Sequence, residues 1–294
     1  MPLIEMSDIT VAYGAAPGSP LRTVLDGIHL DVHEGEFVCV LGQTGCGKST
    51  LLRLLLGSEQ PISGRVLIDG RVHDRPDRTR GYVPQKYSLF PDKTVLDNLT
   101  FGPEALEFSL FGRLTPRFYR RRREFRREAF DYLRRIGLHE TDARKYPDQL
   151  SGGMQQRVAI AQALMTRPRI LLMDEAFSAL DPGTRKDMQC LIRQLWKDFG
   201  ATILFVTHNT HEALTLGTRV VVLAKEGEGG SRVALDLPLP EPRREEDIPW
   251  LVRRLESVSH RGASFESPDA ANTSESPDAV TSSGSPAAAL SGRS

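Results

Sequence analysis

One stretch decides the fold of this chain: Gly42-Gln43-Thr44-Gly45-Cys46-Gly47-Lys48-Ser49-Thr50, which fits the pattern G-x-x-x-x-G-K-[ST] in full. It follows the apolar, β-prone run Phe37-Val38-Cys39-Val40-Leu41 and precedes the helix-like run Leu51-Leu52-Arg53-Leu54-Leu55-Leu56. This strand–loop–helix order is what a phosphate-binding loop requires, because tight glycine turns aim backbone N–H groups and a helix N-terminus at phosphate oxygens. We therefore predict that Lys48 reaches the β- and γ-phosphates of a nucleotide and that the Ser49 hydroxyl ligates Mg²⁺.

The cysteine within this phosphate loop (residues 42–50) has two possible environments. The backbone amides and Lys48 should lower the pKa of the Cys46 thiol, if the thiol faces the loop. Alternatively, the side chain points into the core and behaves as a small hydrophobic group. The sequence leaves both possibilities open.

Composition excludes several classes of protein. The 294 residues suffice for one large or two modest domains, and Lys+Arg and Asp+Glu balance at 38 each. No overall field therefore points to nucleic acid or membrane. No apolar run approaches the roughly 20 residues of a membrane span, and residues 1–5 lack the features of a secretory signal. Three widely spaced cysteines argue against a disulfide framework or a zinc site, so we expect a cytosolic protein.

A second motif is the run Ile170-Leu171-Leu172-Met173-Asp174-Glu175. Its continuous apolar part predicts a central parallel strand that is covered on both faces, and ligands bind at the carboxyl ends of such strands. We expect Asp174 to hold Mg²⁺ and Glu175 to act as the general base on the attacking water. The alternative is that the two carboxylates form the acidic first turn of a helix.

A third motif, the signature, is the run Leu150-Ser151-Gly152-Gly153-Met154-Gln155-Gln156-Arg157. A serine and two glycines that open a helix make a second helix start suited to an anion. One chain cannot easily place two such starts on one γ-phosphate, but two chains arranged head to tail can. We therefore expect Ser151 and Gly153 to face ATP that is bound by the phosphate loop of an opposing subunit.

The rest of the chain predicts an α/β core that carries an inserted helical subdomain. Residues 3–40 alternate apolar and polar side chains as strands do, and residues 65–68 and 80–83 read as another β pair. Residues 93–165 are rich in helix-type spacings and form the predicted insertion. Alternation of strands and helices returns over residues 170–208.

The predicted domain organisation assigns residues 1–240 to one ATPase domain and residues 241–261 to a C-terminal extension with a short helix near 248–258. Residues 262–294 are rich in Ser, Ala, Pro and Gly and are expected to be a disordered tail. Within the insertion, residues 113–127 hold eight arginines. They form either a solvated helix face or a contact with anionic lipid headgroups or an acidic partner.

These motifs together resemble the nucleotide-binding subunit of ATP-binding-cassette transporters. The family's motifs occur in the family's order: the phosphate loop, Gln85, the signature, the acidic strand, the loop Ser178-Ala179-Leu180-Asp181 and His208. The resemblance implies a P-loop NTPase (RecA-like) core with an antiparallel β subdomain and a helical subdomain. It also implies a sandwich dimer that closes on two ATP molecules.

The resemblance further assigns roles to single residues. Tyr13 would stack on adenine, although it could also be an ordinary edge-strand aromatic. Gln85 would sense the γ-phosphate, ligate Mg²⁺ and couple to the membrane subunit. Asp181 would communicate across the dimer, and His208 would contact the γ-phosphate. Asn209 replaces an aspartate that the family often carries, which should weaken the positioning of the histidine.

The partners follow from the same resemblance. Since no membrane domain is evident, the chain is expected to recruit transmembrane permease subunits at the cytoplasmic face of the membrane, a second copy of itself and a separate substrate-binding protein. The runs Thr94-Val95-Leu96-Asp97-Asn98-Leu99 and Asp236-Leu237-Pro238-Leu239-Pro240 look similar to nitrate, sulfonate and taurine importers. The alternatives are a soluble cassette ATPase acting on DNA or ribosomes and a small-molecule kinase. The absence of long heptads, zinc-type cysteines and a second cassette speaks against the first, so no nucleic acid is expected, and the signature speaks against the second.

Overall fold

The computed structural model describes residues 1–14, 21–86, 88–109, 111–178, 180–225, 229–240 and 248–260. These residues all belong to one unit of the chain, Met1–Ala263. The predicted tail at 262–294 lies outside the described residues.

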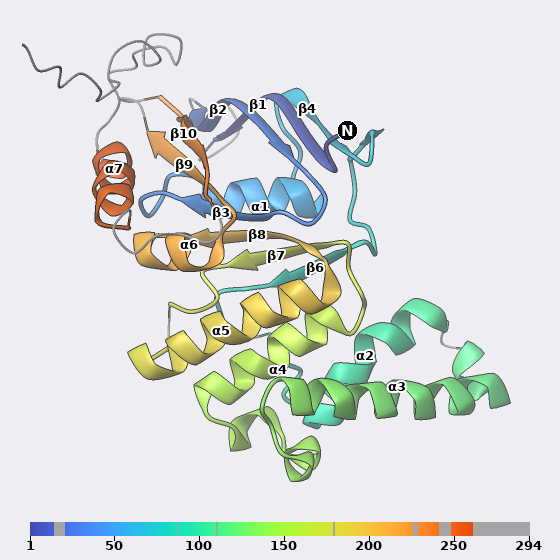
Figure 1. Cartoon of the computed structure of the whole chain (residues 1–294). Helices are drawn as coiled ribbons and strands as arrows, with labels where there is room; N and C mark the ends of the chain where they lie inside the picture. The colour runs from blue at the N-terminus through green and yellow to red at the C-terminus, as the bar shows by residue number, and fades with distance from the viewer. Residues whose placement is uncertain are drawn as a thin grey trace, which may run out of the picture. The chain divides into compact units, whose positions relative to one another are not determined.

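One sheet forms the centre of this unit, with strand order β5-β4-β1-β2-β10-β9-β3-β8-β7-β6 (Figure 1). The strands are β1 (Ile4–Tyr13), β2 (Arg22–Val32), β3 (Phe37–Leu41), β4 (Ser63–Ile68), β5 (Arg71–Val72), β6 (Arg80–Val83), β7 (Ile170–Asp174), β8 (Thr202–Thr207), β9 (Arg219–Lys225) and β10 (Ser231–Pro238). Strands β9, β3, β8, β7 and β6 run parallel to their neighbours within this group. Strands β1, β2, β4 and β5 pair antiparallel.

The predicted pairing of residues 65–68 with residues 80–83 is wrong. The first segment lies in β4, which pairs with β1 and β5, whereas the second is β6, which pairs with β7. The two strands lie near opposite ends of the sheet order. Neighbouring strands in sequence often pair, but here β7 is a fully buried apolar strand whose backbone groups need a partner on that side, and β6 supplies it.

Helices follow the strands. They are α1 (Lys48–Leu56), α2 (Val95–Glu107), α3 (Pro116–Arg135), α4 (Gly152–Leu164), α5 (Pro182–Phe199), α6 (Thr210–Leu216) and α7 (Ile248–His260), with 3₁₀ turns η1 (Phe111–Leu114), η2 (Glu140–Arg144) and η3 (Pro147–Gln149). Helices α2, α3 and α4 occupy the segment predicted to be helical (Figure 1). Helix α5 begins at Pro182, because Asp181 caps it and Pro182 takes the first helical position.

The core lies on both faces of the parallel strands. In β3, Phe37, Cys39 and Leu41 join one apolar cluster, which also takes side chains from α4 and α5. Val38 and Val40 join the other, which takes side chains from α1 and from β1 and β2. Because β3 is buried on both faces, the loop at its carboxyl end starts from a rigid position.

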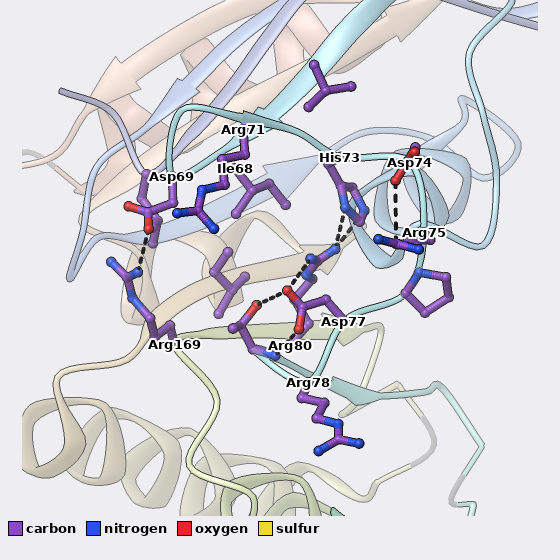
Figure 2. A pocket seen from close by; sticks show the side chains of 15 residues that line it. Ile68, Asp69, Arg71, His73, Asp74, Arg75, Asp77, Arg78, Arg80 and Arg169 are labelled. Atoms are coloured by element: carbon purple, nitrogen blue, oxygen red, sulfur yellow. Dashed lines mark hydrogen bonds and ion pairs between the residues drawn. The ribbon is translucent and has the colours of Figure 1, made fainter.

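A pocket of about 540 Å³ lies between the two end strands of the sheet, and Figure 2 shows its lining. Some of its charged residues form ion pairs: Arg169 with Asp69 at 3.2 Å and Arg80 with Asp77 at 3.4 Å. Arg80 also donates to the carbonyl oxygen of Leu55, in the last turn of α1, at 3.1 Å. The hydrogen bond from Arg80 to Leu55, beside this pocket, thus connects the end of α1 to the start of β6.

Candidate nucleotide-binding site

The phosphate loop connects β3 to α1, as the sequence predicts. Gly45 and Gly47 have φ of +84° and +90°, in the left-handed region that favours glycine. Gly42 is required for a different reason, because a β-carbon there would lie 2.6 Å from the carbonyl oxygen of Leu223. Each of the three glycines in the loop therefore has a steric or conformational cause within this chain.

Lys48, the first residue of α1, is only 5% exposed. Its Nζ donates to the carbonyl oxygens of Gly42 at 2.8 Å and Gln43 at 2.9 Å, and lies 3.6 Å from Oε1 of Glu175. The ammonium is thus folded over the loop and next to the acidic strand. A buried cation at a glycine-rich helix start is suited to phosphate oxygens.

Asp174 lies at the end of β7, with both carboxylate oxygens engaged. Ser49 Oγ donates to Oδ1 at 3.2 Å, and the hydroxyl of Tyr82 donates to Oδ2 at 3.4 Å. Burial raises the pKa of the Asp174 carboxyl, and the Ser49 hydrogen bond partly opposes this shift. The sequence predicted Ser49 and Asp174 but not Tyr82, which only the pairing of β6 with β7 brings to this position.

A hydroxyl and a carboxylate placed together suit the oxygen-rich coordination of Mg²⁺. Among the described residues, no group of three or more His, Cys, Asp or Glu side chains could hold a metal by itself. A cation at Ser49 and Asp174 would therefore need further oxygen ligands from a bound nucleotide or from water. The donor set fits a metal that arrives with its nucleotide.

Glu175 is the point where three of the predicted residues meet. Its Oε2 lies 3.2 Å from Nδ1 of His208 and accepts from Nε2 of Gln85 at 3.4 Å. Its φ is +41°, a left-handed conformation that is costly for a residue other than glycine. Such strain concentrates at active sites, so the backbone supports a functional position for this carboxylate.

Gln85 lies just beyond β6 and donates to both Glu175 and Ser178 Oγ, each at 3.4 Å. In the described part of the chain, no hydrogen bond joins it to Ser49 or Asp174. Its predicted role as an Mg²⁺ ligand stays a prediction.

The segment after β8 shows how Asn209 substitutes for the family's aspartate. Its Oδ1 caps α6 by accepting from the backbone N–H groups of His211 at 3.0 Å and Glu212 at 3.2 Å. Glu212, which the sequence did not single out, is 4% exposed and accepts from Thr207 Oγ1 at 2.6 Å. Burial raises the pKa of the Glu212 carboxyl. An amide therefore makes the capping contacts beside His208 without a charge.

Tyr13, the last residue of β1, is 41% exposed. Its hydroxyl donates to Glu59 and lies 3.5 Å from Thr50 Oγ1, in the phosphate loop. Its side chain helps to line a cavity of about 480 Å³ with Gly14, Arg22, Thr23, Val24, Gly45, Lys225 and Ser231. The tyrosine thus stands beside the phosphate loop with an exposed ring, and Glu59 is a neighbour that the sequence did not suggest.

The expectation of a lowered pKa for Cys46 is wrong. The side chain is 4% exposed and packs in the apolar cluster around α1. Burial raises the pKa of the Cys46 thiol, and this outweighs the opposite influence of Lys48. The alternative, a small hydrophobic group in the core, is confirmed.

The signature opens α4, as predicted, but lies apart from this network. Ser151 caps the helix by accepting from the N–H of Met154 at 3.3 Å, and Gly152 and Gly153 are its first two residues. A β-carbon at Gly153 would lie 2.6 Å from Cγ2 of Thr184. Within the described residues, neither a hydrogen bond nor an ion pair joins residues 151–153 to residues 42–50.

Asp181, in the loop after Ser178, caps α5 by accepting from the N–H of Thr184 at 3.0 Å. Hydrogen bonds from the backbone of Thr184 lower the pKa of the Asp181 carboxyl. Within the chain it therefore acts as a helix cap. Its predicted role across a dimer stays a prediction.

The chain as a whole is similar to several known proteins. Residues 25–178 match the family model described as ABC transporter. The bicarbonate transport ATP-binding protein CmpD of Synechococcus elongatus is 38% identical over 247 residues, covering 84% of each chain. The nitrate import ATP-binding protein NrtD of that organism is 40% identical over 232 residues, covering 79% of this chain and 80% of that protein. A solved dimeric, post-hydrolysis ATP-binding cassette bound to ADP and Pi is 32% identical, with a TM-score of 0.67, covering 81% of this chain and 99% of that one.

Among the described helices, none has both the length and the apolar character needed to cross a membrane.

Proposed function

Because this chain belongs to the ABC transporter family, we propose that it binds and hydrolyses ATP to power import through separate transmembrane permease subunits. The observation that carries the proposal is the network on Glu175. This carboxylate contacts Lys48 of the phosphate loop, His208 after β8 and Gln85 after β6. The ends of four strands, β3, β6, β7 and β8, thus bring a phosphate-binding cation, a general base and two polar groups to one place.

Each residue of the site has a proposed role that follows from its chemistry. Lys48 and the N–H groups of the phosphate loop would bind the β- and γ-phosphates, with the adenine beside the exposed ring of Tyr13. Ser49 and Asp174 would hold Mg²⁺, which when bound neutralises charge on the phosphates. Glu175 would take the proton from the attacking water. His208 would hold the carboxylate in place from one side and contact the γ-phosphate from the other.

We propose that two copies act head to tail. The Ser151 and Gly153 of one copy would face the ATP that the other copy binds, which accounts for a helix start that has no partner in the described phosphate loop. A solved relative of 32% identity is a dimer, which supports this arrangement. Binding to permease subunits would place the chain at the cytoplasmic face of the membrane.

The transported substrate is proposed from the relatives. Those named above serve bicarbonate transport and nitrate import, so we propose a small anion as the substrate and a separate substrate-binding protein as its receptor. The same relatives do not favour a soluble cassette ATPase that acts on DNA or ribosomes.

The substitution Glu175→Gln tests the core of the proposal. It keeps the shape of the side chain but removes the base, so ATP hydrolysis should fall by about 10²- to 10⁴-fold while ATP binding persists. Steady-state phosphate release and binding of a fluorescent ATP analogue measure the two effects.

The matched control is Glu128→Gln, which removes a carboxylate that pairs with Arg167 at 2.7 Å, outside the network on Glu175. It should leave hydrolysis near the normal rate. Normal hydrolysis by the Glu175→Gln chain would show that Glu175 is not the base.

A further inference from the structure

The arginine-rich helix α3 divides into two sets of side chains. One set joins α3 to α2: Arg121 pairs with Glu107 at 2.8 Å, Arg122 with Glu104 at 3.2 Å and Arg126 with Asp97 at 3.3 Å. Arg117 also lies 3.5 Å from Glu107. These four arginines therefore have a structural role within the helical region.

The other set has no such partner. No ion pair or side-chain hydrogen bond engages Arg120, Arg123 or Arg127 in the described part of the chain. These three follow the spacing i, i+3, i+7, so they share one face of α3. All three are exposed, on the side of the helix opposite the buried residues Phe118, Phe125 and Ala129.

Two carboxylates border this face, and both are already engaged. Glu124 pairs with Arg121, and Asp131 pairs with Arg134. The face therefore keeps a local positive charge although the whole chain has a formal net charge of zero.

Large apolar side chains are exposed next to these arginines. Phe111 is 82% exposed, Leu114 is 78% exposed and Tyr119 is 57% exposed, all within nine residues at η1 and the start of α3. Figure 1 shows this corner at the outer end of α2 and α3. We call these three exposed side chains, which lie close together in the chain, the apolar patch.

The patch is held in place by its own local structure. Thr115 caps α3 by accepting from the N–H of Phe118, and its N–H donates to the carbonyl oxygen of Gly112 at 3.2 Å. Below it, the rings of Phe108 and Phe118 meet edge to face, 5.3 Å between centroids. The exposed apolar side chains are therefore presented by an ordered turn.

We propose that this corner, residues 111–127, is a binding surface for anionic phospholipid. Guanidinium groups bind phosphate oxygens in a bidentate manner, and aromatic and aliphatic side chains enter the boundary between headgroups and acyl chains. Basic and apolar groups together make reversible binding stronger than either alone. A purely polyanionic partner would account for these arginines but not for Phe111 and Leu114 beside them. The proposal goes beyond the ATPase function, since it requires neither a permease nor nucleotide.

The test uses the purified full chain and protein-free vesicles of phosphatidylcholine, with and without phosphatidylglycerol. The chain should sediment with the phosphatidylglycerol vesicles, and added salt should release most but not all of it. The triple variant Arg120→Glu/Arg123→Glu/Arg127→Glu should bind at least about a hundredfold more weakly, given the contribution of each basic side chain near an anionic surface. The double variant Phe111→Ser/Leu114→Ser should lose the part of binding that persists at high salt.

Matched controls lie elsewhere on the surface. Arg75→Glu changes a guanidinium whose side chain is 88% exposed, and Val72→Ser removes an apolar side chain that is 69% exposed. Both should bind vesicles as the unchanged chain does. Normal ATPase activity of every variant in solution would show that each is folded.

Equal binding to both kinds of vesicle, or unchanged binding by the triple variant, would overturn the proposal. So would capture of the chain by poly-glutamate with no binding to anionic vesicles, which would identify an acidic protein as the partner. Loss of ATPase activity by Glu175→Gln and lipid binding are read out separately, so failure of either proposal can be told from failure of the other.

Discussion

The phosphate loop and the signature are both helix starts suited to an anion, but their surroundings differ. Lys48 is buried and contacts the loop carbonyls and Glu175, and Ser49 contacts Asp174. Ser151 is exposed, and its side chain caps only its own helix. One anion site is thus connected to acidic groups from other strands, while the other faces outward. This difference fits the proposal that a single chain assembles the catalytic half of the site and leaves the signature for a second chain.

The largest expected effect is a loss of ATPase activity when either the phosphate loop or the signature is altered. Lys48→Ala should abolish productive ATP binding, because it removes the buried cation of the loop. Ser151→Arg should spare binding but prevent closure of a head-to-tail dimer. Each variant alone should show only background ATPase activity. Mixing the two should restore part of the activity, because one composite site combines an intact phosphate loop with an intact signature.

The measurement is ATPase rate at varied mixing ratios. A suitable control mixes Lys48→Ala with Lys48→Ala/Ser151→Arg, which can form no intact composite site. Full activity of the Ser151→Arg chain alone would end the argument that the signature completes the site of another copy.

A smaller effect is expected on the rate at which maleimide labels the buried Cys46 of the phosphate loop. Since burial raises the pKa of the Cys46 thiol, less thiolate is present at neutral pH than for an ordinary cysteine, and maleimide should label Cys46 slowly. Cys190 lies on the exposed side of α5 and should be labelled much faster. Because the pKa of the Cys46 thiol is raised, labelling of Cys46 should still increase as the pH is raised above neutral.

Mass spectrometry of each cysteine, with and without Mg-ATP, gives the two rates. Denaturant serves as the control, because it should make the two rates similar. Rapid labelling of Cys46 in the folded chain would mean that the loop is more open than its packing indicates.

The smallest expected effect is on the free energy of unfolding, when Asn209 beside His208 is replaced. Asn209→Ala removes the cap of α6 and should lower the free energy of unfolding by about 1 kcal/mol. Asn209→Asp keeps the cap and should leave stability and ATPase rate close to normal. Chemical denaturation and steady-state kinetics measure both. A large gain in ATPase rate for Asn209→Asp would instead show that the missing carboxylate weakens the positioning of His208.

The sequence by itself determined the α/β P-loop NTPase fold, which the likeness to the solved cassette confirms. It also determined the strand–loop–helix at residues 42–50, the buried strand that ends at Asp174 and the helix start at Ser151. These features are local: glycine conformation, apolar runs and helix caps depend on residues near one another in the chain. A pattern of that kind can be recognised before the chain is folded.

The tertiary structure alone decided which distant residues meet. It paired β6 with β7, and so brought Tyr82 to Asp174 and Gln85 to Glu175. It also buried Cys46, which decided between the two environments that the sequence left open and raised the pKa of the thiol. Pairing between strands and the desolvation of a side chain depend on packing over the whole core, and neither is encoded in the neighbouring residues. The same packing divided the arginines of α3 into those that bind α2 and those that remain for another surface.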